Sequence, residues 1–198
     1  GAAAEAGAAA SGGRPGFLVD SYQVTEEYFR RLKNLAAVAC LEDLGISYPV
    51  DLLVNYNLYA PKLNYAEGLR TLVGTAYVPL RQEFAKACSR ERQVRERVEH
   101  VLITTGGGDP FFAAAGFLDA FLKEGQEEGG TVFHVVSGPM NKFAGELKAR
   151  YGENPRVSIH ERVTDMKSIM EQCDVALTAA GSTVYELCSM GIPMEQSS

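Results

Sequence analysis

The sequence predicts an α/β protein with two domains, each built on a parallel sheet. Short apolar runs alternate with helical segments along most of the chain, which is typical of parallel strands covered by helices. Two small-residue turns, at 105–110 and 179–183, each follow such a run. The 198 residues, 46% hydrophobic and 22% charged, are enough for one or two globular domains.

The first domain is expected at residues 17–94, after an Ala/Gly-rich segment at 1–16 whose low complexity predicts disorder. Thr25 is the expected cap of the first helix, because two glutamates follow it in the first turn. The charged stretch 88–100 is the best candidate for the domain boundary. In chain order the expected elements are a strand at 17–20, a helix at 23–35, strands at 37–41 and 51–55, and a short segment starting at 72.

The second domain is expected at residues 95–193. Gly191 and Pro193 predict the end of its last helix, since a glycine often follows a helix and a proline cannot continue one. Its expected strands lie at 100–104, 131–137, 157–160 and 175–178, and its expected helices at 111–124, 141–151, 166–172 and 184–190.

The turn before the last helix is the most informative part of the chain. Gly181 lets the backbone approach a ligand, and Ser182 and Thr183 place hydroxyls at a helix N-terminus, which favours a phosphate. Glu186 lies about one turn further on, where it can accept hydrogen bonds from ribose hydroxyls. We therefore expect a nucleotide-activated ligand. The same residues also fit an ordinary Ser/Thr cap, and Glu186 fits a capping box, so spacing alone leaves both interpretations open.

The earlier turn, Gly106-Gly107-Gly108-Asp109, follows the expected strand at 100–104. It is not the G-x-G-x-x-G of dinucleotide sites and lacks the G-K-[ST] of a P-loop. Ligands of open α/β sheets bind outside the carboxyl ends of the strands, so this turn and the turn at Gly181 should face the same cleft. We expect a second phosphate loop here; the alternative is a tight turn with positive φ angles.

Polar residues at strand ends and in loops of the first half are candidate sugar contacts, because such positions line the ligand cleft in this architecture. Arg81 could pair bidentately with a phosphate or a carboxylate. The alternative for each is an ordinary surface or turn residue. The candidates are Asp20, Tyr22, Asn55, Asn57, Tyr77 and Arg81.

Composition argues against several classes of function. A net charge of −6 with a pI near 5.2 disfavours nucleic-acid binding. No apolar run reaches the roughly 18 residues of a transmembrane helix. The four cysteines and three histidines show no metal-binding spacing, so we expect no metal site, no cofactor and a reducing, cytoplasmic setting.

Four segments together resemble one family. They are A-A-G-S-T-x-x-E-L-x-x-x-G-x-P at 179–193, Val19-Asp20-Ser21-Tyr22, and the stretches 72–84 and 103–110. They resemble the UDP-sugar hydrolases of pseudaminic acid biosynthesis, which are similar to the lipid II-forming N-acetylglucosaminyltransferases. The resemblance covers about residues 17 to 193 and implies a GT-B-like fold of two Rossmann-like domains.

The resemblance also implies roles for residues. Gly106 to Asp109 and Gly181 to Thr183 would grip the diphosphate, and Glu186 would bind the ribose. Gly108 stands where the family usually has a serine, which removes one hydroxyl but keeps the backbone donors. The family's Gly-His loop, which carries the expected general base, has no counterpart here, so no catalytic residue is assigned. We expect a fragment truncated at both ends that binds nucleotide weakly and does not turn over alone.

The function expected from the resemblance is that of a UDP-2,4-diacetamido-2,4,6-trideoxy-β-L-altropyranose hydrolase, in which water attacks the activated sugar and UDP leaves. One alternative is a GT-B glycosyltransferase that uses an acceptor hydroxyl in place of water. Another is a non-catalytic protein that only binds a nucleotide sugar. The expected partner is in each case a small UDP-sugar. The oligomeric state stays open.

Overall fold

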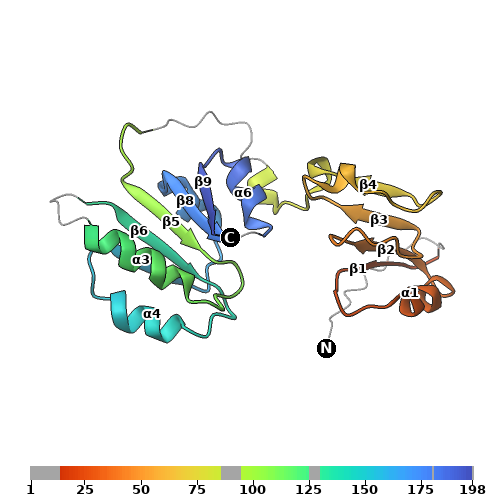
Figure 1. Cartoon of the computed structure of the whole chain (residues 1–198), viewed down its shortest axis with the longest axis horizontal. Coiled ribbons are helices and arrows are strands. Elements are labelled where there is room, and N and C mark those ends of the chain that lie inside the picture. Colours follow the sequence, from red (N-terminus) through yellow and green to blue (C-terminus); the bar gives the residue numbers. More distant parts are fainter. Residues whose placement is uncertain (1–13, 86–94, 125–129, 180, 198) are drawn as a thin grey trace. The chain divides into compact units, whose positions relative to one another are not determined.

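The computed structural model describes residues 14–85, 95–124, 130–179 and 181–197 and confirms the predicted α/β class. Its strands form two separate parallel sheets, as in Rossmann-like domains (Figure 1). The chain divides into two compact units, one ending at Pro79 and the other beginning at Leu80. Much of the charged stretch 88–100, our expected boundary, lies outside the described residues.

The first unit carries a four-stranded sheet in the order β1-β2-β3-β4, with all strands parallel. Helix α1 packs on this sheet through Phe29, which is buried against Val38, Cys40 and Leu53. The strands are β1 (Gly16–Val19), β2 (Ala37–Leu41), β3 (Leu52–Asn55) and β4 (Thr71–Val73), with α1 at Glu26–Lys33 and short 3-10 turns η1 at Ala60–Lys62 and η2 at Thr75–Tyr77.

Helix α1 begins where the sequence places its cap. The hydroxyl of Thr25 accepts a hydrogen bond from the backbone N–H of Tyr28 at 3.3 Å, so the predicted cap is confirmed. The helix is shorter than the expected 23–35 because it starts only after this cap and ends at Lys33.

The second unit carries a five-stranded parallel sheet in the order β7-β6-β5-β8-β9. The middle of the central strand β5, Val101-Leu102-Ile103, is an unbroken apolar run, as expected for a strand with both faces covered. The strands are β5 (His100–Thr104), β6 (Val132–Ser137), β7 (Val157–Glu161), β8 (Val175–Ala179) and β9 (Met194–Ser197); the helices are α2 (Gln82–Ala85), α3 (Ala113–Glu124), α4 (Ala144–Tyr151), α5 (Met166–Gln172) and α6 (Thr183–Ser189).

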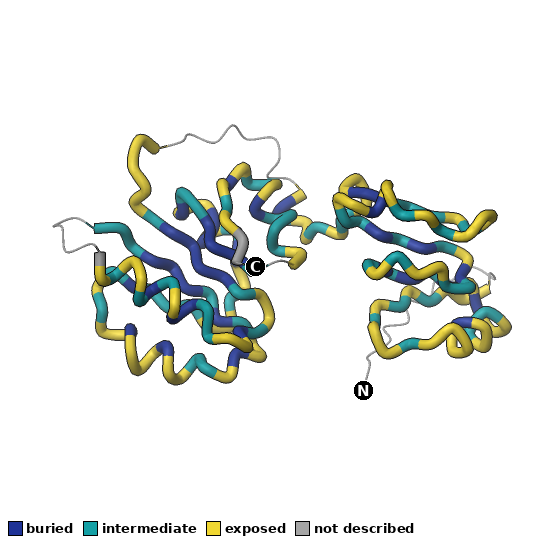
Figure 2. The backbone as a smooth tube through the Cα atoms, viewed as in Figure 1, coloured by how far each residue is buried: buried dark blue, intermediate teal, exposed yellow. Residues whose placement is uncertain are grey.

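Two hydrophobic clusters make this unit a three-layer α/β/α arrangement. On one face Val101 and Ile103 of β5 pack with Leu118 of α3 and Leu147 of α4. On the other face Leu102 packs with residues of α2, α5 and α6, among them the fully buried Leu187. The buried strands between exposed outer helix surfaces are visible in Figure 2. Because successive side chains of β5 point to opposite faces of the sheet, one set packs against α3 and α4 and the other against α2, α5 and α6.

One β-strand and one α-helix were missed by the sequence analysis. Strand β9 adds a parallel edge to β8, with Ala176 opposite Met194, whereas the sequence predicts a second domain that ends at residue 193. The short helix α2 lies where no element was assigned. In the part of the chain that the structure describes, no helix is both long and apolar enough to cross a membrane.

Candidate functional site

A cleft of about 640 Å³ opens at the carboxyl ends of the strands in the second unit. Small-molecule sites typically have volumes of about 300–1,000 Å³. The cleft is lined by the ends of β5, β6 and β8 and by the loops after β5, β6, β7 and β8. Three further residues line it: Arg81 just before α2, Met166 at the start of α5, and Glu186 within α6.

The strand order explains why a cleft forms here. From β5 the chain proceeds outward through β6 to β7, and it then returns to place β8 on the opposite side of β5. The loops after β5 and β8 thus flank the point where the strand order reverses, which is where open α/β sheets bind ligands. Part of each turn that the sequence singled out lines this cleft, namely Gly106 and Gly107 of the first turn and Gly181, Ser182 and Thr183 of the second.

The backbone of these turns is open toward a ligand. Gly106 has a φ of +76°, a conformation that favours glycine, and a Cβ on either Gly106 or Gly181 would meet no atom within 4 Å. The loop after β6 supports the loop after β5, since the N–H of Met140 donates to the carbonyl of Gly107 at 2.8 Å. A ligand can therefore approach the main chain at Gly106 and Gly181 without displacing a side chain.

The alternative of a side-chain cap does not describe the start of α6. Ser182 occupies the N-cap position, but its hydroxyl makes no capping hydrogen bond. The carboxylate of Glu186 accepts from the guanidinium of Arg81, with 2.8 Å from Nε to Oε1 and 3.0 Å from Nη2 to Oε2. Arg81, which the sequence predicts to be a sugar contact of the first domain, thus belongs to the second unit and lines the cleft beside Glu186.

Gly108 and Asp109 follow Gly107 directly but do not line the cleft. They border a separate depression of about 350 Å³ together with Met140 and Phe143. The buried carboxylate of Asp109 accepts from the backbone N–H groups of Ala113 and Ala114, at 2.8 and 3.1 Å. Asp109 therefore caps α3. Its hydrogen bonds hold the chain between the glycine turn and this helix in place.

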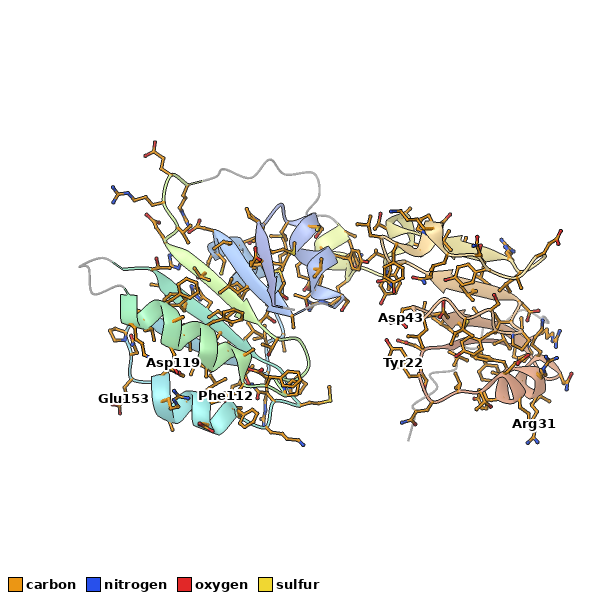
Figure 3. All side chains as sticks on the ribbon, viewed as in Figure 1. Tyr22, Arg31, Asp43, Phe112, Asp119 and Glu153 are labelled. Carbon is orange, nitrogen blue, oxygen red and sulfur yellow. The ribbon has the colours of Figure 1, made fainter. Side chains whose placement is uncertain are left out.

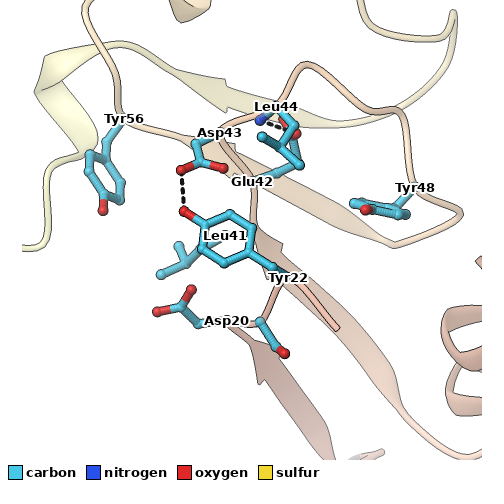
Figure 4. Close-up of a pocket in the computed structure, with 9 residues that line it drawn as sticks. Asp20, Tyr22, Leu41, Glu42, Asp43, Leu44, Tyr48 and Tyr56 are labelled. Carbon is cyan, nitrogen blue, oxygen red and sulfur yellow. Dashed lines mark hydrogen bonds between the residues drawn. The ribbon is translucent and has the colours of Figure 1, made fainter. Parts of the chain in front are cut away.

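In the first unit, Asp20 and Tyr22 lie after β1 and line a small pocket of about 50 Å³ (Figure 4). The Tyr22 hydroxyl donates to Oδ2 of Asp43 at 2.5 Å, as the dashed line in Figure 4 marks, and Figure 3 shows where the two residues lie in the first unit. This hydrogen bond, followed by the charge of Asp43, raises the pKa of Tyr22 to about 12. The pocket is too small to enclose a sugar ring.

The remaining candidates of the first unit have different settings. Asn55 is fully buried: its Nδ2 donates to the Tyr65 hydroxyl at 2.9 Å, and its Oδ1 accepts from the backbone and side chain of Asn57. This network holds the loop after β3. Tyr77 lies in η2 and is exposed. Neither the two asparagines nor Tyr77 lines the pocket beside Asp20.

Several cleft residues were missed by the sequence analysis. Arg162 follows β7, lines the cleft and has a φ of +52°, which is uncommon for a residue with a side chain. Ser137 and Gly138 line it from the end of β6. These positions could have been found, because Gly138 and Arg162 follow predicted strands and Ser137 ends one. Neither segment, however, carries a recognisable phosphate-binding pattern.

The three histidines, scattered in the sequence, meet on one face of the second sheet. His100 Nδ1 lies 3.0 Å from His134 Nε2, and His134 Nδ1 lies 3.2 Å from His160 Nε2. They come from the adjacent strands β5, β6 and β7, and none of them lines the cleft. Among the described residues no group of three or more His, Cys, Asp or Glu side chains could hold a metal ion.

This histidine row should make folding stability depend on pH. Burial, reinforced by His160 and His100, lowers the pKa of His134 below its ordinary value of 6.5. Above that value both folded and unfolded chains hold neutral His134; as the pH falls below it, the unfolded chain binds a proton more readily, so the folded state loses stability. Urea unfolding at pH 7.5 and 5.5 should show this loss reduced in His134→Gln. An equal loss in both proteins would contradict the assignment.

No protein-family model matches the sequence. The chain is similar to the uncharacterized protein MJ1062 of Methanocaldococcus jannaschii, with 24% identity over 89% of this chain and 39% of that protein. It is also similar to the spore coat polysaccharide biosynthesis protein SpsG of Bacillus subtilis, with 25% identity over 65% of this chain and 38% of that protein. The chain thus spans about two fifths of the length of these relatives.

Proposed function

We propose that the cleft of the second unit binds the nucleoside diphosphate part of a UDP-sugar. One observation carries the proposal: two open glycine turns and Glu186 line the same cleft. The two turns follow β5 and β8, on either side of the point where the strand order reverses. Backbone N–H groups and the hydroxyls of Ser182 and Thr183 are suitable donors for a diphosphate. The carboxylate of Glu186 is a suitable acceptor for ribose hydroxyls.

The reaction that we propose for the whole protein is hydrolysis of a nucleotide-activated deoxy amino sugar. Water attacks the sugar, UDP leaves, and donors of the glycine turns stabilise the charge of the leaving diphosphate. The motif resemblance supports this choice, and the similarity to a protein of spore coat polysaccharide biosynthesis supports a sugar-related role. In the first unit, Asp20 and Tyr22 are our candidates for sugar contacts.

We propose a cytoplasmic setting, in keeping with the cysteine spacing.

Calorimetric titration with UDP, UMP and uridine tests the nucleotide site. We expect saturable binding of UDP and an affinity for UMP that is weaker by about tenfold or more, since a hydrogen bond to a charged group contributes about 1.5–3 kcal/mol. Uridine should bind weakest. Equal affinities for the three ligands, or no binding to a chain that is folded by circular dichroism, would contradict the proposal.

A further inference from the structure

Arg81 and Glu186 form a two-point contact within the cleft. The edge of the guanidinium defined by Nε and Nη2 faces both carboxylate oxygens, at 2.8 and 3.0 Å. Such a fork fixes the plane of a carboxylate as well as its position, which a single point charge does not. The Glu186 side chain is 12% exposed, so its orientation is further restricted by its surroundings.

Arg81 is itself held from two other directions. Its Nη1 lies 3.3 Å from Oε1 of Glu83, and its guanidinium carbon lies 4.8 Å from the ring centroid of the fully buried Phe84. The Glu83 contact is an ion pair without hydrogen-bond geometry. The hydrogen bond to Glu186 is the largest effect raising the pKa of Arg81. Arg81 is thus a fixed support for Glu186.

Within the described part of the chain, the fork leaves part of the acceptor capacity of Glu186 open. A carboxylate offers about four acceptor sites, of which Arg81 occupies two. The positive charge also offsets the repulsion that Glu186 would exert on a bound diphosphate. Two acceptor sites in a fixed plane match the two adjacent hydroxyls of a ribose, whereas a 2′-deoxyribose would leave one of them without a donor.

We propose that Arg81 is a positioning residue for Glu186, and that the site consequently selects ribonucleoside diphosphates over their 2′-deoxy counterparts. The inference rests on the proposed nucleotide site. It also assigns to Arg81 an effect on the choice between ribose and 2′-deoxyribose, separate from any effect on phosphate binding.

The test compares UDP and 2′-deoxy-UDP binding by calorimetry in the parent chain, Arg81→Lys and Arg150→Lys. Lysine keeps the charge but loses the fork. The parent should prefer UDP by roughly tenfold, a factor that corresponds to about 1.4 kcal/mol. In Arg81→Lys this preference should disappear through weaker UDP binding, with 2′-deoxy-UDP binding unchanged. Arg150 pairs with Asp119 on the α3/α4 side, so its lysine variant should retain the preference.

Each other result overturns the inference in a recognisable way. If Arg81→Lys weakens both ligands by the same factor, Arg81 acts on the phosphates and not through Glu186. If the parent binds both ligands equally, the nucleotide site stands but the ribose selection does not. If the folded parent binds neither ligand, the proposed function fails and the inference fails with it. Glu186→Gln, which keeps the shape of the side chain, provides a second variant that should lose the preference.

Discussion

Gly138→Ala should lower the free energy of unfolding by about 2 kcal/mol or more and weaken UDP binding. A Cβ at this position would lie 2.1 Å from the carbonyl oxygen of Gly106 and 2.6 Å from that of Gly107. Both are backbone atoms, so the loops after β5 and β6 must separate to accommodate the methyl group. Added atoms in a tightly packed region typically cost about 1–3 kcal/mol. Urea unfolding and UDP titration of the variant measure the two effects.

Gly116→Ala is the matched control for this substitution. Gly116 lies within α3, and a Cβ there would meet no atom within 4 Å. Because alanine is favoured over glycine in a helix, this variant should be more stable by roughly 0.5–1 kcal/mol and should bind UDP as the parent does. If Gly138→Ala were as stable as the parent, the close packing of the two loops would be contradicted.

Gly181→Asp should reduce UDP affinity on the order of 100-fold without unfolding the protein. Gly181 is exposed, and a side chain there has open space around its Cβ. A carboxylate placed about 4 Å from a phosphate at a protein surface is repelled by about 4 kcal/mol, part of which salt screens. Calorimetric titrations at low and high salt should show a larger loss of affinity at low salt.

Gly181→Asn separates charge from size in this prediction. Asparagine has nearly the same shape as aspartate but no charge, so its effect on UDP affinity should be much smaller and independent of salt. Equal losses in the two variants would show that the new side chain blocks the turn sterically. In that case the repulsion argument for a bound diphosphate would lose its support.

The strands of the second unit, apart from β9, could be predicted well because each is marked by an apolar run in its own sequence. Val101, Leu102 and Ile103 are consecutive and all buried, as is typical of a strand covered on both faces. The position of the phosphate-turn candidates followed from the same reasoning, since both turns come directly after such strands. Strand β9 was missed because Met194-Glu-Gln-Ser carries little apolar pattern and is defined by its pairing with β8.

Features that depend on strand order could not be predicted. The sequence does not show that β5, β6 and β7 are neighbours, and only this adjacency brings His100, His134 and His160 into hydrogen-bonding contact. The pairing of Arg81 with Glu186 joins residues 105 positions apart. The sequence anticipated that Arg81 could bind a carboxylate, but the partner depends on how α2 and α6 pack.

Asp109 illustrates a motif residue whose role depends on the local chain path. The sequence grouped it with the glycine turn as a phosphate contact. The structure uses its carboxylate for the first N–H groups of α3, after Phe112 takes a φ of +54°. A sequence pattern cannot distinguish a ligand contact from a helix cap when both use the same acceptor atoms.

An NMR titration of the ¹⁵N-labelled chain with UDP tests the nucleotide site most directly, because it reports where the ligand binds. The amide signals of Gly106, Gly107, Gly181, Ser182 and Thr183 should show the largest shifts and saturate together, while Gly116 in α3 should stay unchanged. Shifts confined to the pocket beside Asp20 and Tyr22, or no shifts in a well-dispersed spectrum, would contradict a nucleotide site in the cleft of the second unit.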